Sequence, residues 1–291
     1  MIRFSRYTIL YFLLSALILV PGVYSLIRYG LKPSIDFTGG SVVEVTLERD
    51  VTEETMRALG TKQSLSFTEI TKEGPSHYTL QMKQSPESSI DAFLKSLETP
   101  AGKVEIKRRD AVGAVVGKEL LSKAVVAALF AMTAILLYVA YAFKDIKFGV
   151  SAVVALFHDV LIVFSVFSLL GHFWGVEVDT LFVTAFLTTM SFSVHDTIVI
   201  FDRIREYRRK DSSTPLDNLS DVALTETMGR SLVNSFTIIF MLLALVLMGG
   251  STIRWFAVAL LIGTITGTYS SPFIATPFLL MWDKWEKRKK K

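Results

Sequence analysis

Long apolar stretches alternate with short polar segments along most of this chain. Each stretch has about the 20 residues that an α-helix needs to cross roughly 30 Å of hydrocarbon. We therefore predict six membrane-spanning helices, at Tyr7–Ile27, Lys123–Ala142, Phe148–Leu170, Thr180–Phe201, Leu232–Gly249 and Trp255–Trp282. The apolar core of the first stretch is too long for a cleavable signal peptide, so we interpret it as a retained anchor.

One extended polar region, residues 30–122, interrupts this pattern after the first stretch. Its hydrophobic periodicity predicts four strands and two helices. The strands are expected at Ser41–Glu48, Ser66–Lys72, His77–Lys83 and Lys103–Arg109, and the helices at Thr52–Lys62 and Pro86–Glu98. Strand, helix, strand, strand, helix, strand is the order of a ferredoxin-like domain, in which two helices cover one face of a four-stranded sheet.

The predicted fold is thus an α-helical polytopic membrane protein with a ferredoxin-like α+β extracytoplasmic domain. We expect the parts to be an N-terminal segment with the first transmembrane helix (1–29), the extracytoplasmic domain (30–122), the other transmembrane helices (123–282) and a basic cytoplasmic tail (283–291). Because the tail directly follows a span, we interpret its lysines as a retention charge and not as a nucleic-acid contact.

The charged residues between the spans predict the orientation. Arg3 and Arg6 precede the first span, and Lys144 and Lys147 lie between the second and third. Five cations follow the fourth span: Arg203, Arg205, Arg208, Arg209 and Lys210. The only charges in the intervening loop 171–179 are acidic. By the positive-inside rule, both termini are expected in the cytoplasm.

The composition excludes several kinds of chemistry. The chain has no cysteine, which excludes disulfides, thiolate metal sites and cysteine nucleophiles. Residues 113–119 resemble a phosphate-binding loop, but the segment is one residue short and has Glu119 where that motif needs Ser or Thr. Neither a zinc-protease HExxH nor the GxGD of an intramembrane aspartyl protease is present. We expect no enzymatic activity, no metal and no cofactor.

Two His-Asp pairs lie inside predicted spans, His158-Asp159 in the third and His195-Asp196 in the fourth. An intramembrane carboxylate costs roughly 2.5–3.5 kcal/mol on insertion scales, so it is expected to face protein or a wet cavity and to be functional. Only four histidines occur in the chain, which makes a chance repeat of the pair less plausible. We predict a shared role in proton or ion handling, with Asp196 the stronger candidate. His195 is either a proton relay or a polar neighbour, and the sequence leaves both open.

Other polar residues near these spans have more than one interpretation. Thr189, Ser193, Asp196 and Thr197 form a stripe at helical spacing, and Thr184, Thr188, Ser191 and His195 form the row beside it. Arg230 either snorkels to the lipid head groups or reaches Asp196 and responds to its charge. The segment 202–206 is interpreted as a solvated helix end. In the last span, Gly263, Gly267 and Ser271 predict close helix packing, and Pro272 and Pro277 can kink the helix.

Several motifs, taken in order, resemble SecF, the smaller subunit of the bacterial SecDF protein-export complex. They are Asp36-Phe37-Thr38-Gly39-Gly40 after the first span, Val112–Leu120 before the second, His158-Asp159-Val160, and His195–Val199 followed by Asp202–Glu206. The chain departs from the family at two positions. Ala114 stands where the family usually has Pro, and His195 stands where Asn is common before the aspartate.

The resemblance implies a transmembrane region like half of an RND transporter, completed by a SecD-like subunit. It also implies use of the proton-motive force to assist preproteins, driven by SecA, as they leave the SecYEG channel. It places the protein among the lipids of the bacterial inner (plasma) membrane as a multi-pass subunit. Asp196 matches the family's membrane carboxylate, Arg230 its partner arginine and Asp159 a family His-Asp pair, and residues 36–40 match a hinge motif.

Two other functions stay open at this point. An independent proton-coupled, RND-type exporter of small solutes would need a second six-helix half, supplied by homodimerisation, and a deep outer pocket. A structural membrane scaffold would tolerate a neutral residue at Asp196, whereas the two transport functions would not.

Overall fold

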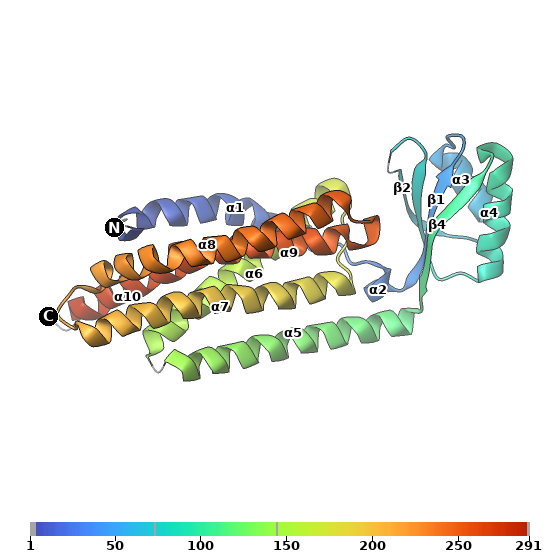
Figure 1. The fold of residues 1–291 in the computed structure, drawn as a ribbon. Coiled ribbons are helices and arrows are strands. Elements are labelled where there is room, and N and C mark those ends of the chain that lie inside the picture. Colours follow the sequence, from blue (N-terminus) through green and yellow to red (C-terminus); the bar gives the residue numbers. More distant parts are fainter. Residues whose placement is uncertain (1–3, 73, 144, 290–291) are drawn as a thin grey trace. The chain divides into compact units, whose positions relative to one another are not determined.

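The computed structural model describes residues 4–72, 74–143 and 145–289 (Figure 1). It divides into a helical unit, which contains the described residues up to Lys32 and from Val126 onward, and a second unit, Pro33–Val125. The predicted cytoplasmic cations Arg3, Lys144, Lys290 and Lys291 lie outside the described residues.

The helical unit is built from long apolar helices. They are η1 (Phe4–Tyr7, a 3-10 turn), α1 (Thr8–Arg28), α5 (Ala114–Phe143, which starts in the second unit), α6 (Ile146–Trp174), α7 (Thr180–Lys210), α8 (Leu216–Met248), α9 (Ser251–Ser270), the π-helical turn η2 (Ser271–Ala275) and α10 (Thr276–Lys289). In the described part of the chain, six helices are long and apolar enough to cross a membrane, the last of them formed by α9, η2 and α10 together. This confirms the predicted fold class.

The helices extend beyond the predicted spans, because an apolar stretch shows only the part of a helix that suits hydrocarbon. The span predicted at Leu232–Gly249 is the second half of α8, which begins at Leu216. Polar side-chain caps mark the starts of α6 and α7. The carboxylate of Asp145 accepts from the backbone N–H of Lys147 at α6, and that of Asp179 accepts from Phe182 at α7, at 2.7 Å.

The second unit has the predicted order of strands and helices. It contains the short helix α2 (Ile35–Thr38), β1 (Gly40–Leu47), α3 (Glu53–Lys62), β2 (Phe67–Lys72), β3 (His77–Met82), α4 (Glu87–Ala101) and β4 (Val104–Val112). The antiparallel sheet has the strand order β2-β3-β1-β4 expected of a ferredoxin-like domain. Strand β4 continues past the predicted Arg109 because Asp110, Ala111 and Val112 pair with the first residues of β1. Val43, Val45 and Leu47 pack against Phe93 and Leu97 of α4.

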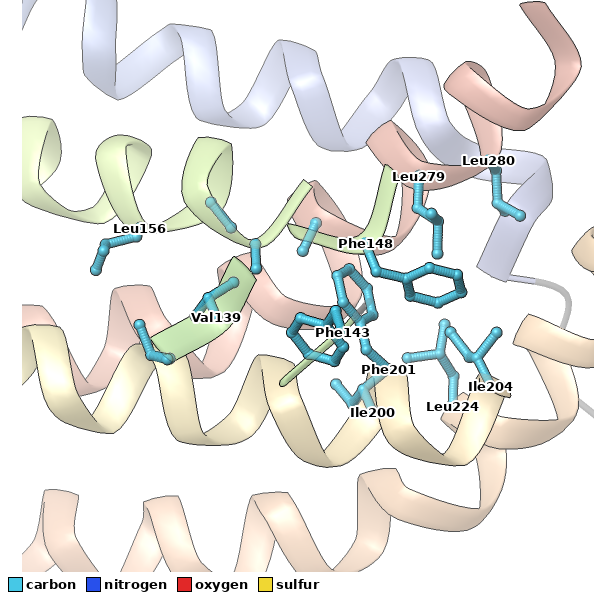
Figure 2. Close-up of a cluster of buried hydrophobic side chains, with 14 of the residues drawn as sticks. Val139, Phe143, Phe148, Leu156, Ile200, Phe201, Ile204, Leu224, Leu279 and Leu280 are labelled. Carbon is cyan, nitrogen blue, oxygen red and sulfur yellow. The ribbon is translucent and has the colours of Figure 1, made fainter. Parts of the chain in front are cut away.

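Burial differs strongly among the six spans. In the most apolar window of α6 and of α7, 56% and 44% of the residues are buried, against 6% for α5 and 11% for α8. Helices α6 and α7 are therefore central, while many apolar side chains of α5 and α8 are exposed. Where α5 ends, Phe143, Phe148 and Phe201 join α5, α6 and α7, with ring centroids 5.3–6.2 Å apart (Figure 2).

Charged side chains gather at one end of the helical unit. Asp283 of α10 is 3% exposed and forms ion pairs with Lys147 at 3.3 Å and with Lys287 at 2.7 Å. Asp221 of α8, also buried, accepts hydrogen bonds from the backbone N–H and the hydroxyl of Ser5, both at 2.9 Å. These contacts bring the first described residues, the start of α6 and the C-terminal helix to the same end.

Candidate functional site

Helix α7 carries Asp196 on the border between its buried face and its open face. The stripe Thr189, Ser193 and Thr197 is buried, whereas His195 in the neighbouring row is exposed. The buried stripe packs closely on α9, because a Cβ at Gly263 would lie 2.3 Å from the Thr189 side chain and one at Gly267 would lie 3.1 Å from Ser193. The close packing predicted for the last span is confirmed.

Asp196 is half-buried and faces α8. One of its carboxylate oxygens accepts a hydrogen bond from the Ser231 hydroxyl at 2.8 Å. The carboxylate also lines a cavity of about 300 Å³ between α7, α8 and α9. Its other lining residues are Phe192, Ser193, His195, Asn234, Ser235, Thr237, Ile238, Gly263, Thr264, Gly267 and Thr268. Many of these side chains are polar, so the cavity suits water next to the carboxylate.

The structure brings His195 to this cavity, but it does not join His195 or Arg230 to Asp196 by a direct contact. Neither side chain forms a hydrogen bond or ion pair with Asp196 among the described residues. Arg230 is exposed and lines a second cavity of about 530 Å³, together with Asp202 and Glu226. Ser231, the neighbour of Arg230 in the chain, contacts the carboxylate instead.

The segment 202–206, expected to be a solvated helix end, is only partly exposed: Ile204 is buried in the core, and ion pairs order the charged side chains. Arg203 donates from Nε and Nη2 to the carboxylate of Glu226 on α8, at 2.8 and 2.5 Å. It also pairs with Glu206, and the Tyr207 hydroxyl donates to Glu226 at 2.8 Å. The segment therefore holds α7 against α8 next to the second cavity, a role that its interpretation as a solvated helix end did not include.

Asp159 occupies a different environment, in the middle of the helical unit. It is 5% exposed, and one of its oxygens accepts from the hydroxyls of Ser193 at 2.5 Å and Ser270 at 2.6 Å. The other oxygen contacts Nδ1 of His158 at 2.8 Å. The Nε2 atom of His158 is hydrogen-bonded to Ser15 of α1. This buried network joins α1, α6, α7 and α9.

Three of these partners were missed by the sequence interpretation. Ser15, Ser231 and Ser270 are single serines in apolar helices, where such residues commonly satisfy only backbone carbonyls. Ser270 could have been selected from its position two residues before Pro272, because a proline inside a helix marks a distortion. In the structure, the π-helical turn η2 starts directly after Ser270. Among the described residues, no group of three His, Asp or Glu side chains is placed to hold a metal ion.

The Asp36–Gly40 motif builds a tight turn between α2 and β1. The hydroxyl of Ser34 accepts from the backbone N–H of Asp36 at the start of α2, and Phe37 is buried. Gly39 and Gly40 have φ values of +73° and +138°, which side chains rarely allow. Within this unit, Gly39 also lies against the start of α5, because a Cβ there would be 2.5 Å from Cα of Ala114.

Gly117 completes this close approach from the α5 side. A Cβ at Gly117 would lie 2.9 Å from the backbone nitrogen of Gly39 and 3.1 Å from the carbonyl of Phe37. The turn and the first residues of α5 are thus packed backbone to backbone. The residues before the second span, selected above only as part of a motif, therefore form the surface against which the glycine turn rests.

Comparisons with known proteins agree on one group. The family described as "Protein export membrane protein SecD/SecF, C-terminal" matches residues 92–285, and the family "SecD/SecF GG Motif" matches residues 24–51. The chain is 38% identical to "Protein translocase subunit SecF" of Thermobaculum terrenum, over 97% of this chain and 94% of the relative. It is 35% identical to the protein of the same name in Anaerolinea thermophila, over 96% and 93%.

Solved structures give the same result. The chain resembles the crystal structure of SecDF, "a translocon-associated membrane protein", from a Thermus species, with a TM-score of 0.86 and 30% identity over 97% of this chain. It also resembles SecDF in a super-membrane-facing form, with a TM-score of 0.69 and 32% identity over 98% of this chain. In both comparisons the chain spans 39% of the SecDF chain.

Proposed function

The chain belongs to the SecD/SecF family of protein-export membrane proteins, and we propose that it uses the proton-motive force to assist polypeptide translocation. In this proposal it acts as the SecF-type subunit of a complex with a SecD-like subunit and the SecYEG channel, on preproteins delivered by SecA. Asp196 is the group that takes up and releases the proton.

The half-buried position of Asp196 beside a polar cavity is the observation that carries this proposal. A carboxylate inside a membrane-spanning helix needs access to water if it is to exchange protons. The cavity that Asp196 lines supplies room for water on the side of Asn234 and Thr237. A single side-chain hydrogen bond, from Ser231, holds the carboxylate among the described residues, so loss of the charge changes few contacts.

The hydrogen bond between Asp196 and Ser231 supports a route for coupling. The first cavity is lined on α8 from Asn234 onward, and the second is lined on α8 by residues up to Arg230. Ser231 lies between these two stretches. In the proposal, protonation of Asp196 weakens its attraction for the Ser231 hydroxyl and for the Arg230 charge, and the packing of α7 on α8 changes.

The outward faces of α5 and α8 support the proposed partner. These two spans bury few of their residues within the chain, and the relatives of solved structure are SecDF chains of which this chain covers 39%. A SecD-like subunit would supply the rest and cover part of those faces. We further propose that the charged end of the helical unit, with Lys147 and Arg208 near Asp283, is cytoplasmic and holds both termini.

Movement would then have to reach the ferredoxin-like domain, which we propose to be extracytoplasmic. Helix α1 leads into that domain and α5 leads out of it. The close approach of Gly39 and Gly117 holds the turn before β1 against the helix that follows β4, so the two chain connections of this domain meet at one point. We propose residues 36–40 as the hinge motif on this account.

The test is Asp196→Asn in membrane vesicles that contain the complete complex, with preprotein export measured with and without a proton gradient. The amide keeps the shape of the side chain and removes only its titration, so we expect the gradient-dependent stimulation to be lost while insertion and partner assembly are kept. Undiminished gradient dependence in this variant would overturn the proposed role.

Asp211→Asn is the matched control. Asp211 lies in the loop after α7, where hydrogen bonds from Ser213 and Thr214 hold the pKa of its carboxyl well below the usual range. It therefore stays ionised near neutral pH in the native protein and should not exchange protons during transport. The amide oxygen of Asn can keep accepting the three hydrogen bonds that one carboxylate oxygen accepts from Ser213 and Thr214, and its NH2 group can donate to the Thr214 hydroxyl in place of the fourth. Export by this variant should therefore stay at the level of the native protein.

A further inference from the structure

Helix α1 touches α6 through a narrow stripe of small and polar residues. The buried residues of α1 are Ser15, Gly22 and Ser25, whereas most of its leucines and isoleucines are exposed. Ser15 meets His158, Gly22 meets Ser165 and Ser25 meets Ser168, all at an offset of 143 residues. A constant offset means that the two helices run parallel in one fixed register.

The hydrogen-bonding groups in this stripe have defined directions. An ionised Asp159 can only accept, so Nδ1–H of His158 donates to it, and in a neutral imidazole Nε2 is left to accept from the Ser15 hydroxyl. This arrangement uses both ring nitrogens of a histidine that is 8% exposed. No donor or acceptor of the ring is left for water, so His158 links the two helices.

The other end of the network reaches the wall of the Asp196 cavity. Ser193, which donates to Asp159, is one of the residues that line that cavity. Ser193 lies on α7 three residues before Asp196, on the same helical face. Hydrogen bonds therefore lead without a break from the cavity wall on α7, through α6, to α1.

We propose that Ser15 and His158 are positioning residues, which fasten α1 to α6 so that both move as one body with the wall of the Asp196 cavity. The passage of motion from Asp196 to α1 rests on the proposed function. The attachment of α1 to α6 does not depend on that function. Because the chain runs from the end of α1 into the second unit, this link would carry the change at α7 toward the exported polypeptide.

The first test measures the fastening alone. Ser25→Cys and Ser168→Cys are introduced together, since their hydroxyls lie 2.9 Å apart and the chain contains no other thiol. The rate of oxidative cross-linking in membranes then reports how closely α1 stays on α6. Adding Ser15→Ala or His158→Ala should slow cross-linking by about three- to tenfold, the range that one net hydrogen bond supports. The two changes together should slow it no further.

Ser165→Ala is the control in the same interface. Ser165 is buried against Gly22, and its hydroxyl has no hydrogen-bond partner among the described residues, so its removal should leave the cross-linking rate unchanged. Tyr269 of α9 also donates to the Tyr11 carbonyl of α1, at 2.7 Å, which is why slowing and not complete loss is expected. Equal rates for the Ser15→Ala and Ser165→Ala proteins would overturn the proposal.

The second test measures export with the cross-link formed. If α1 and α6 move as one body, the oxidised Ser25→Cys, Ser168→Cys protein should keep its gradient-dependent stimulation, and the cross-link should restore stimulation lost in the Ser15→Ala variant. Loss on oxidation that reduction reverses would overturn the one-body proposal. The Asp196→Asn variant decides the proposed function separately, because its failure leaves the cross-linking rates as they are.

Discussion

The two His-Asp pairs share a dipeptide but occupy opposite environments. In the α6 pair, both side chains are buried, and together they contact Ser15, Ser193 and Ser270 on three other helices. In the α7 pair, the histidine is exposed, and the aspartate is half-buried with one side-chain hydrogen bond and a cavity beside it. The environment, and not the dipeptide, decides that Asp159 is held by hydrogen bonds whereas Asp196 has access to a cavity.

This difference follows from where the two helices lie. A central helix such as α6 has neighbours on most sides, so a polar pair on it must find partners within the protein. Helix α7 also packs on several neighbours, but at Asp196 its surface faces the cavity between α7, α8 and α9. The two aspartates are joined through Ser193, which contacts one and lines the cavity of the other. We infer that Asp159 fixes the helices around Asp196, the proposed proton carrier.

The largest expected effect separates the two aspartates by stability. Asp159→Ala removes one partner of a buried pair and leaves His158, Ser193 and Ser270 with unpaired polar atoms, so the free energy of unfolding should fall by about 3–5 kcal/mol. Asp196→Ala removes one hydrogen bond at a half-buried site and should cost only about 1 kcal/mol.

Denaturant titration of the purified complex in detergent, followed by the loss of helical signal, compares the two variants. Asp159→Asn is the companion variant, because its amide keeps the volume and part of the hydrogen bonding, and its loss of stability should be intermediate. Equal losses for the two alanine variants would show that the environments differ less than the structure indicates.

The fold could be predicted from sequence because hydrophobic patterns report it directly. The apolar stretches gave the six spans, and the alternation within residues 30–122 gave the order of strands and helices. The first half of α8, Leu216–Ser231, was missed because it has no such stretch. Asp196 could be selected because a carboxylate in an apolar stretch stands out without any knowledge of its neighbours.

The partners of these carboxylates depend on packing between distant segments, so the sequence could not supply them. Ser15 and His158 are far apart in the chain, and nothing in either helix alone pairs them. The same limit applies to Arg230, whose possible contact with Asp196 was left open. The structure places it at the neighbouring cavity, without an ion pair to Asp196 among the described residues, and assigns the contact to Ser231.

A smaller effect is expected from Arg230, and it tests whether Asp196 depends on a nearby positive charge. If the charge of Arg230 acts on Asp196 without a direct contact, Arg230→Met should lower gradient-dependent stimulation by roughly tenfold, the effect of a nearby cation on a carboxylate. Arg230→Lys should keep most of the activity, because no paired guanidinium contact with Asp196 would be lost. Export into vesicles measures both. Full activity of the Met variant would favour snorkelling to lipid and remove Arg230 from the coupling site.

The smallest effect is expected at His195, where the comparison between the two pairs can fail most directly. His195 is exposed and has no hydrogen bond or ion pair among the described residues, whereas His158 uses both ring nitrogens. His195→Ala should therefore leave gradient-dependent stimulation within about twofold of the native value, less than one net hydrogen bond supports. His195→Asn should behave like the native protein, because asparagine is common at this position in the family that the motifs resemble.

His158→Ala, measured beside them in the same vesicles, should reduce stimulation further. If both His195→Ala and His195→Asn abolished stimulation, the imidazole of His195 would act as a proton relay, and exposure of a side chain beside the cavity would not mean that it can be dispensed with.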